Sequence, residues 1–444
     1  MATGTVPTSS DVMEWQAGPF TSRPVWRVEP KIDVVTDLMH SKIREILRDG
    51  GDNPQDLPKA AFLGGGAFNK LYLMEYRNSS WILRVTLPVD PHYKTASEVA
   101  TLKLLESSTS LPAPRAMAHY AGAADAPPGD NRLGLEWILM TKVPGKTLTD
   151  SWDMSMKKKL NLVEMVAEKV HEIYTCDSLQ FSSIGNVFEC GGYENAPGME
   201  KSPKPSKFSV DRIVSMTFFW NQRLSQPVNR GPFASSAEWF TSRLQLVDFE
   251  CNQVLESEVA DEDDKADAVR FKSVAQRLLN QIPQFVPANE KFVLHHDDIN
   301  AGNLLVDPDT GDLTGIVDWE CVSVLPAWKS CQLPCFLGYN PIRIAQPIRR
   351  AYHINQDGSP NELYFHHLRE WELTVLGRRF LEWMEIQDSD WVDVYQASGR
   401  IRDFDYAVSN CDNEFAVKKI ERWLNIVEKG DEGQYERLLQ NINE

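Results

Sequence analysis

The chain has few cysteines, and none of them stands in a metal-binding spacing. Seven cysteines are scattered over 444 residues, from Cys176 to Cys411, and no two of them form a Cys-x-x-Cys motif. Disulfide frameworks use dense, even-numbered sets of cysteines, and structural zinc sites use closely spaced pairs. The odd number and the wide spacing therefore predict reduced thiols in a cytoplasmic protein, with neither a disulfide framework nor a zinc site.

Long apolar runs and basic residues near the N-terminus are also lacking. No apolar stretch approaches the roughly 20 residues that a membrane-spanning helix needs. The first 20 residues contain no Lys or Arg and include Asp11 and Glu14. Secretory signals and mitochondrial transit peptides have the opposite character. We therefore expect a protein without integral membrane association.

The chain as a whole has fewer basic than acidic residues. The chain has 46 Lys and Arg residues against 63 Asp and Glu residues, which gives a formal net charge of −17. Such a charge repels nucleic acids and anionic membrane surfaces and attracts cations. The balance excludes nucleic acid as an expected partner and favours a cationic small molecule, while the oligomeric state is not predicted.

The length predicts two lobes preceded by an extension. A chain of 444 residues exceeds the size at which a single hydrophobic core normally stops growing. Residues 1 to about 25 are small, polar and interrupted by proline, which is typical of a disordered leader. Apolar residues from Ile32 to Leu47 recur at helical spacing, so we expect a helix that packs against the first lobe.

The most informative stretch is residues 294–306, followed by residues 316–320. Short apolar runs flank a polar loop that contains Asp298 and Asn303, and a turn rich in Asp and Gly leads into a second strand. This hairpin is expected to carry Asp318 back beside Asn303. Two carboxylates and one amide suit phosphoryl transfer, because one carboxylate accepts a hydroxyl proton and the other oxygens bind Mg²⁺.

These residues resemble the aminoglycoside phosphotransferase and choline kinase family. The pattern is His296-x-Asp298-x-x-x-x-Asn303, followed by Asp318-Trp319-Glu320. Two further segments resemble the fungal branch of the family, namely residues 65–70 and the pair Trp328-Lys329. The resemblance covers roughly residues 60 to 340 and implies ATP and Mg²⁺ as cofactors. It also implies that Asp298 is the catalytic base and that Asn303 and Asp318 are the metal ligands. His296 is expected to be an orienting, hydrogen-bonded loop residue rather than a proton carrier.

The same resemblance implies the fold class and its division. The expected fold is α+β and protein-kinase-like, with a small, mainly antiparallel β N-lobe and a larger, mainly α-helical C-lobe. The leader and extension helix would occupy residues 1–55, the N-lobe residues 56–141 and the C-lobe residues 142–444. The C-lobe would carry the catalytic loop at 294–306 and the metal motif at 318–320.

In the N-lobe, a glycine-rich turn is the candidate for phosphate contact. Gly64, Gly65 and Gly66 lie between two predicted strands, and glycine lets backbone amides approach a triphosphate closely. Asn69 is the polar residue best placed to add a side-chain contact. The competing interpretation is an ordinary glycine-rich hairpin turn, because the stretch is neither Gly-x-Gly-x-x-Gly nor a Walker loop.

Arg84 and Glu98 form the next candidate pair. Arg84 interrupts an apolar strand where the family often has a lysine that holds the nucleotide phosphates, and Glu98 would pair with it by resemblance. Arginine can bind a phosphate through its planar fork, with a reach different from that of lysine. Two alternatives stay open: Arg84 extends to solvent from an edge strand, or Glu98 belongs to a Thr95-x-x-Glu98 capping box.

The predicted hinge and acceptor side are less specific. By resemblance, the backbone of Met140, Thr141 and Lys142 would meet the adenine edge, although a strand followed by Pro-Gly is also typical of a plain turn. Helices are expected from about Glu362 to Ile386 and from Asn413 to Leu439. Their carboxylates and aromatic rings suit an ammonium group, or they form ordinary amphipathic faces; they are Glu370, Trp371, Glu372, Trp383 and Glu385.

Three functions follow from these patterns. The leading hypothesis is an ATP- and Mg²⁺-dependent small-molecule kinase that phosphorylates a hydroxyl of a small metabolite, with a cationic acceptor favoured. No activation segment or Ala-Pro-Glu motif follows Glu320, which argues against a protein kinase. The alternative is a catalytically weak, nucleotide-binding regulatory protein of the same fold. A third possibility is a metal-dependent phosphohydrolase that uses residues 295–298 as ligands.

Overall fold

The protein divides into two compact units that are interleaved in sequence. The computed structural model describes residues 9–18, 22–47, 58–76, 78–122, 132–190, 207–338, 342–430 and 437–439. The first unit comprises Met1–Pro144, Gly185–Ser225 and Gly315–Ser323, and the second comprises Gly145–Ile184, Gln226–Thr314 and Val324–Glu444. The sequence predicts a single change of lobe at residues 141 and 142. The compact units change at Pro144, and two later segments belong to the first unit.

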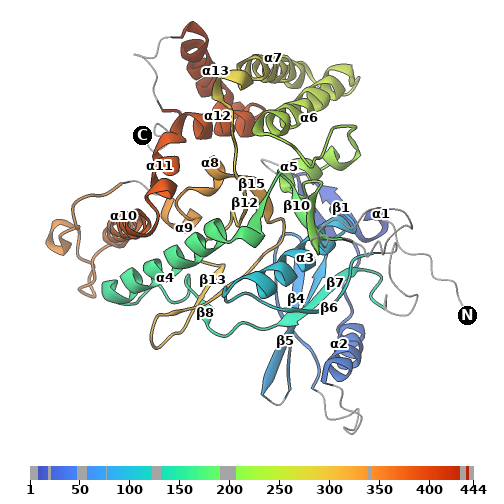
Figure 1. Cartoon of the computed structure of the whole chain (residues 1–444), viewed down its shortest axis with the longest axis vertical. Helices are drawn as coiled ribbons and strands as arrows, with labels where there is room; N and C mark the ends of the chain where they lie inside the picture. Colours follow the sequence, from blue (N-terminus) through green and yellow to red (C-terminus); the bar gives the residue numbers. More distant parts are fainter. Residues whose placement is uncertain are drawn as a thin grey trace, which may run out of the picture. The chain divides into compact units, whose positions relative to one another are not determined.

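A five-stranded antiparallel sheet forms the centre of the first unit (Figure 1). Its order is β3-β4-β5-β7-β6. The strands are β3 (Ala61–Gly65), β4 (Asn69–Tyr76), β5 (Ser79–Thr86), β7 (Glu136–Thr141) and β6 (Ala116–Tyr120). The strands predicted on either side of the glycines are present, but Gly64 and Gly65 belong to the end of β3 and pair with Leu71 and Lys70, so of the three glycines only Gly66 lies in the turn. The register pairs Asn69 with Thr86 and Leu71 with Arg84.

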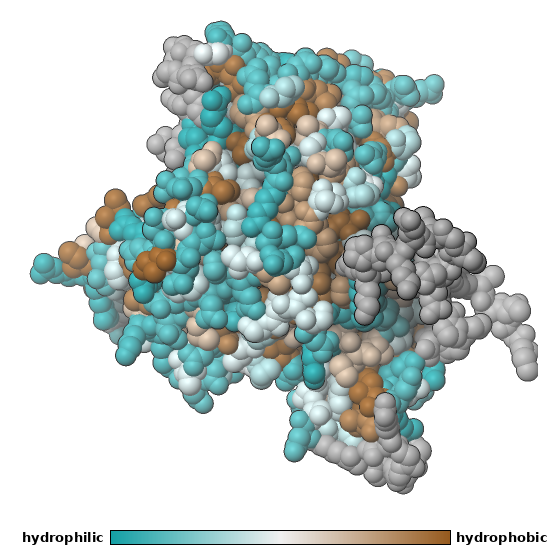
Figure 2. Space-filling view, in the orientation of Figure 1, coloured by the Kyte–Doolittle hydropathy of each residue, from teal (hydrophilic) through white to brown (hydrophobic). Residues whose placement is uncertain are grey.

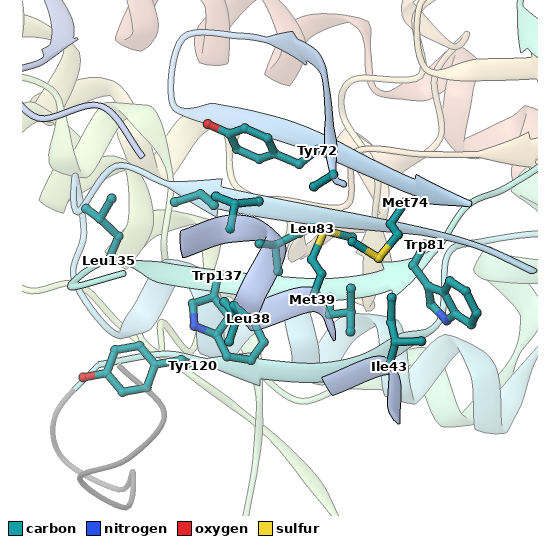
Figure 3. Packing of buried hydrophobic residues seen from close by; sticks show 14 of the residues in the cluster. Leu38, Met39, Ile43, Tyr72, Met74, Trp81, Leu83, Tyr120, Leu135 and Trp137 are labelled. Carbon is teal, nitrogen blue, oxygen red and sulfur yellow. The ribbon is translucent and has the colours of Figure 1, made fainter. Parts of the chain in front are cut away.

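Two helices cover opposite faces of this sheet. Side chains alternate between the faces of a strand, and Trp137 and Leu139 of β7 pack with α2 (Ile32–Leu47) in one cluster. Ile138 and Met140 instead pack with Val99 of α3 (Tyr93–Ser108). Figure 3 shows Leu38, Met39 and Ile43 of α2 lying against the aromatic and apolar side chains of the sheet. The predicted extension helix is therefore part of the core of the first unit.

The expectation of a disordered leader up to about residue 25 is wrong for the residues that the structure describes. A short helix α1 (Ser9–Val12) precedes an antiparallel pair, β1 (Met13–Gln16) and β2 (Arg23–Trp26). Met13 is buried and packs with Trp15 and Trp26 in a cluster that also holds Phe68. These few large apolar side chains bury enough surface to order the segment, although the surrounding composition is polar. Residues 1–8 and 19–21 lie outside the described residues.

Hydrogen bonds of Asn186 connect the later segments of the first unit to one another and to α3. This residue lies on β10 (Asn186–Glu189), which pairs with β11 (Phe208–Asp211) and is followed by α5 (Met216–Phe219) and the 3₁₀ turn η3 (Arg223–Ser225). The buried Asn186 amide donates to Ser97 on α3 at 3.1 Å and to the carbonyl of Val322 at 2.9 Å. Its oxygen accepts from Val214 at 2.7 Å. One side chain thus connects helix α3 to the segment that contains residues 318–320.

The second unit is mainly helical. Its longer helices are α4 (Met156–Thr175), α6 (Ser236–Glu256), α7 (Glu262–Phe285), α10 (Glu362–Gln387), α11 (Ser389–Ala397), α12 (Gly399–Asn410) and α13 (Glu414–Lys429). Short turns of helix are η2 (Asp177–Leu179), α8 (Ala327–Ser330), α9 (Cys335–Gly338) and η4 (Arg349–Ala351). The predicted helix near 362–386 is confirmed. The helix predicted over 413–439 ends at Lys429, because Gly430 adopts a left-handed conformation with φ of 66°.

Two small sheets carry the polar loop of the second unit. One has the order β15-β12-β9, and the other has the order β14-β13-β8. Their strands are β8 (Lys146–Thr147), β9 (Gln180–Phe181), β12 (Phe292–His295), β13 (Leu304–Val306), β14 (Leu313–Ile316) and β15 (Ser323–Pro326). The unit boundary falls inside β14 and at the start of β15. The α+β fold with a β-rich part and a larger helical part, predicted from the sequence, is confirmed.

The visible surface is predominantly hydrophilic (Figure 2). Brown patches appear over the region where Figure 1 draws the chain around α10. Large exposed apolar side chains before that helix include Ile342, Ile344 and Ile348. Among the described residues, no helix combines the length and the apolar character that a membrane span requires.

Candidate functional site

The loop between β12 and β13 holds the Asp298 carboxylate with two amide side chains. Asn300 donates to one carboxylate oxygen at 2.8 Å, and Asn303 donates to the other at 3.0 Å. Asn303 also donates to the Asp298 carbonyl at 2.9 Å. The exposed carboxylate therefore has a defined orientation at the surface of the second unit. Because the amide nitrogen of Asn303 is used in this way, its amide oxygen is the group that can bind a cation.

Contacts with His296 and Thr149 hold the loop in place. His296 is buried, with 3% of its surface exposed, and its Nδ1 accepts from the backbone nitrogen of Asp298 at 3.3 Å. Accepting at Nδ1 is compatible with an imidazole that carries its proton on Nε2. The backbone of Thr149 donates to the Ala301 carbonyl at 3.0 Å. His296 thus has the contacts of an orienting residue, as the sequence predicts.

The neighbouring residues do not form a transition-metal site. Burial lowers the pKa of His295 to about 3, assisted by the positive charge of Lys329, so this imidazole is neutral at pH 7. Within the described part of the chain, no group of three or more His, Cys, Asp or Glu side chains has a metal-binding arrangement. The phosphohydrolase hypothesis stays a prediction.

In the first unit, Asp318 lies on a tight and unusual turn. Its φ of 66° is in the left-handed region, which a residue with a side chain adopts rarely. The next residue, Trp319, is 1% exposed, and its indole nitrogen donates to the Ile316 carbonyl at 2.9 Å. The buried indole holds the turn, and Asp318 is left with a side chain that is 37% exposed.

Arg84 connects Asp318 to helix α3. Its Nη1 donates to an Asp318 carboxylate oxygen at 2.9 Å, and its Nη2 forms an ion pair with Glu98. The side chains of Arg84 and Glu98 are only 7% and 4% exposed, so each charge compensates the other. β5 is an inner strand of the sheet, so the alternative of an edge-strand arginine reaching solvent is excluded.

The capping-box alternative for Glu98 is also excluded. Helix α3 begins at Tyr93, and its N-cap residue His92 makes no side-chain capping bond. Thr95 is the third residue of the helix, so it does not occupy the N-cap position that a capping box requires. The predicted pairing of Glu98 with Arg84 is present, and its role in nucleotide binding stays a prediction.

Glu320 and Asn69 contact each other within the first unit. The amide nitrogen of Asn69 donates to Glu320 at 2.7 Å and its oxygen accepts from Thr86 at 2.7 Å, and the contact of Asn69 with a phosphate stays a prediction. Lys94, which is 2% exposed, lies 2.5 Å from the same Glu320 oxygen. Burial alone would raise the pKa of Glu320, but the charges of Lys94 and Arg84 and the two hydrogen bonds lower it to about 2.

Sequence reasoning did not identify Lys94 and Thr86, although both had a detectable signal. Lys94 precedes Glu98 by four residues, so the two share one face of α3. Thr86 follows Arg84 by two residues, so the two share one face of β5. The spacing alone therefore identifies both residues, because each shares a face of its helix or strand with a member of the Arg84 and Glu98 pair.

The glycine turn keeps open space where a phosphate contact is predicted. The Gly66 nitrogen donates to the Asn69 carbonyl at 3.0 Å, which closes the turn between β3 and β4. A Cβ atom added to Gly66 would meet nothing within 4 Å, and one added to Gly65 would come within 3.4 Å of the Asn69 carbonyl oxygen. A ligand can therefore approach the backbone at Gly66, and contact with the nucleotide by Gly65 and Gly66 stays a prediction.

Of the predicted hinge residues, Met140 and Thr141 are the last two residues of β7, and Lys142 directly follows that strand. Met140 is buried at the pairing position opposite Ile82. The Lys142 nitrogen donates to the Ser80 carbonyl at 3.0 Å, and its side chain lies 3.5 Å from Glu75. That backbone nitrogen is already used within the unit, so an adenine ring would need another backbone group of this segment. The contact of Met140 and Lys142 with the base stays a prediction.

Two of the three α10 carboxylates that suit an ammonium group, Glu370 and Glu372, are already paired. Glu370 forms an ion pair with Arg343 at 2.8 Å, and Glu372 forms one with Lys159 at 2.7 Å. The Trp152 indole also donates to Glu372 at 2.9 Å. These contacts fit the interpretation of ordinary helix faces. The expectation of a cationic acceptor therefore depends on the net charge and on the exposed Glu385.

The predicted site residues thus form one group in each unit. Asp298, His296 and Asn303 lie together in the second unit, whereas Arg84, Glu98 and Asp318 lie together in the first. Asn303 and Asp318 both present oxygen atoms of the kind that Mg²⁺ prefers, so the donor set fits this metal. The convergence of the two groups on one metal ion stays a prediction.

Residues 59–328 match the model of the phosphotransferase enzyme family. A subtelomeric hrmA-associated cluster protein of Aspergillus fumigatus is 24% identical over 319 residues, which cover 63% of this chain and 60% of that protein. The clavilactone A biosynthesis cluster protein Y of Ampulloclitocybe clavipes is 26% identical over 56% of this chain and 54% of its own length. The mitochondrial protein named altered inheritance of mitochondria protein 9, from Lachancea thermotolerans, is 22% identical over 62% of this chain and 50% of its own length.

The chain therefore spans about half to three fifths of the length of these curated relatives. Among solved structures, the gentamicin complex of aminoglycoside phosphotransferase APH(2″)-IIa has a TM-score of 0.46 at 12% identity, covering 93% of this chain and 99% of that chain. The ADP-bound APH(2″)-Ib has a TM-score of 0.43 at 13% identity, covering 87% and 96%.

Proposed function

The chain belongs to the phosphotransferase enzyme family, and on that premise we propose that it transfers the γ-phosphate of ATP to a hydroxyl of a small-molecule acceptor, with Mg²⁺ as cofactor. The observation that supports the proposal most directly is the loop around Asp298. Two amides orient its exposed carboxylate, and the buried His296 supports the loop. A fixed carboxylate of this kind suits the removal of a hydroxyl proton.

Each side chain has a separate role in this proposal. Asp298 orients the acceptor hydroxyl and accepts its proton. Asn303 and Asp318 would hold Mg²⁺, which when bound neutralises charge on the phosphates. Arg84, supported by Glu98, would bind a phosphate oxygen through its guanidinium. The protein then acts chiefly by alignment and charge compensation, which is the usual contribution in phosphoryl transfer.

Replacement of the two carboxylates tests the assignment. We expect Asp298→Asn to lower ATP turnover by about 100- to 10,000-fold, the range found for general acid–base groups, and Asp318→Ala to abolish it. Asp309→Asn is the matched control, because Asp309 is an exposed carboxylate on the turn after β13. Turnover would be measured with Mg²⁺ and a panel of hydroxyl-bearing metabolites, with circular dichroism as the check on folding. Full activity of the Asp318 variant would refute the metal assignment.

One observation supports the second candidate, a nucleotide-binding protein with weak catalysis. Arg84 replaces the family's lysine and is held by both Glu98 and Asp318, so a phosphate has to compete with two carboxylates for it. A thermal-shift titration with ATP and Mg²⁺ separates the candidates. Stabilisation without transfer to any acceptor in the panel would favour the regulatory function, and transfer to one acceptor would favour the kinase.

A further inference from the structure

We propose that Glu320 is a positioning residue: Lys94 and Asn69 hold its carboxylate, and this contact sets the orientation of Asp318 and joins the glycine turn to the metal motif. The inference rests on the proposed function, because Asp318 is the carboxylate that would bind the metal. It also assigns a role to Lys94 and Thr86.

The contacts of Glu320 are short, buried and made within one unit. Lys94 Nζ lies 2.5 Å from Glu320 Oε2, and Asn69 Nδ2 donates to the same oxygen at 2.7 Å. Lys94 also donates to Thr86 at 2.9 Å and to the Asn69 oxygen at 3.3 Å. Lys94 is 2% exposed and the Glu320 side chain 16%. A buried lysine requires an anionic partner, and Glu320 supplies that charge.

Glu320, Lys94 and Thr86 form a second set of contacts that resembles the set formed by Asp318, Arg84 and Glu98. Arg84 and Thr86 share a face of β5, Glu98 and Lys94 share a face of α3, and the two acidic residues are two apart in the motif. In the first set the strand contributes the cation and the helix a carboxylate. In the second set the helix contributes the cation. Each acidic residue of the motif therefore contacts a cation of its own.

Asp318 depends on contacts on both sides, because its backbone is strained. Its φ of 66° is unfavourable for a residue with a Cβ atom. The buried indole of Trp319 holds the turn on one side of Asp318. On the other side, the carboxylate of Glu320 is held by Lys94 of α3 and Asn69 of β4. Without this second contact, Asp318 can relax away from Arg84. Since Asn69 closes the glycine turn, the same contact also connects that turn to the motif.

The competing role for Glu320 is that of a third oxygen ligand of the metal. The two roles differ in what they require of Lys94. A ligand role predicts that removal of the competing cation leaves metal binding unchanged or improves it. A positioning role predicts that removal of Lys94 is as harmful as removal of Glu320, because either change opens the same contact.

The first test needs no activity. The coupling free energy between Arg84 and Asp318 would be measured by a double-mutant cycle, from the urea unfolding of Arg84→Met, Asp318→Asn and the double variant. The cycle would be measured first in the wild-type protein and then in a protein that also carries Glu320→Gln. We expect the coupling to fall by more than half with Glu320→Gln and to be unchanged with Glu106→Gln, an exposed glutamate on α3. An undiminished coupling would overturn the proposal.

If Glu320→Gln does not fold, the background becomes Lys94→Met with Glu320→Gln, which leaves no buried charge unpaired. The expected loss of coupling is the same, and an undiminished coupling again overturns the proposal.

The second test uses the Mg²⁺ dependence of turnover. We expect Lys94→Met and Glu320→Gln each to raise the Mg²⁺ concentration at half-maximal rate by about tenfold, the lower end for residues that support a ligand. The double variant should be no worse than either single one. An unchanged or lower Mg²⁺ requirement in Lys94→Met would show that Glu320 is a ligand. An inactive wild type would refute the proposed function, and the coupling experiment would still decide the role of Glu320.

Discussion

Arg84 is the residue on which the first unit's candidate site depends most. It is buried, and it contacts two carboxylates that come from helix α3 and from the motif at 318–320. Removal of one partner of a buried ion pair leaves an uncompensated charge. Arg84 therefore contributes to stability as well as to the proposed binding of phosphate.

We expect Arg84→Met to lower the free energy of unfolding by about 3–5 kcal/mol, because Glu98 is left buried without its cation. Addition of Glu98→Gln should recover part of that loss, since the remaining buried charge is removed. Urea unfolding followed by tryptophan fluorescence measures both effects. A loss below about 1 kcal/mol, as for an exposed pair, would contradict the burial of this contact.

Asp405 makes the corresponding contact in the second unit. It accepts from Arg243 at 2.6 Å and from Lys329 at 2.6 Å. Burial alone would raise its pKa, but the charges of Lys329 and Arg243 lower the pKa of Asp405 to about 2. The pair Trp328-Lys329, which matches the fungal branch, therefore has a structural role, because Lys329 holds Asp405 and Trp328 donates to Ser236 at 2.9 Å.

This pKa predicts a pH dependence of stability. The folded value lies below the value of about 3.9 for an unfolded aspartate, so the carboxylate stabilises the fold above about pH 4 and loses that effect as the pH falls towards 2. We expect Asp405→Asn to be less stable than the wild type at pH 7, with the difference narrowing between about pH 4 and 2. Urea unfolding at several pH values measures it. A difference that stays constant over that range would contradict the assignment, and Asp309→Asn is the exposed control.

At the scale of elements, α2 covers a face of the sheet that the strands leave apolar. Val35, Met39 and Ile43 are fully buried against Trp137 and its neighbours. The hydrophobic spacing was readable because α2 is amphipathic with a regular period. The hairpin of β1 and β2 was not readable, because two four-residue strands with two tryptophans have no periodicity long enough to outweigh their polar context.

Met39→Ala tests whether α2 belongs to the core. Loss of a fully buried methionine side chain removes transfer free energy and leaves a cavity, so we expect a destabilisation of about 2–5 kcal/mol. Ile32→Ala on the same helix is the control, because Ile32 is 39% exposed. Chemical denaturation measures both. Equal effects of the two substitutions would show that α2 is not packed as described.

At the scale of the whole molecule, the net charge of −17 should influence the choice of acceptor. A cationic acceptor is attracted by the summed field, and salt screens that attraction. We expect KM for a cationic hydroxyl acceptor to rise severalfold between about 0.02 M and about 0.3 M salt, while KM for a neutral acceptor of similar size stays constant. Steady-state kinetics at several ionic strengths measure this. A KM that ignores salt for both acceptors would remove the reason to prefer cations.

The pairing of Arg84 with Glu98 was predicted from the resemblance to the family. Local patterns in the sequence were sufficient for the strands on either side of the glycine turn, the α2 and α10 helices and the loop that presents Asp298. These features depend on periodicity, on turn residues and on spacings within a few residues of one another, all of which are written along the chain. The partners of Glu320 are of another kind. Lys94, Asn69 and Glu320 are separated by up to 251 residues, and only the packing of α3 and β4 around the motif brings them together. A buried charge takes the nearest opposite charge that the fold supplies, so the tertiary structure alone decided that Glu320 is held by Lys94 and Asn69.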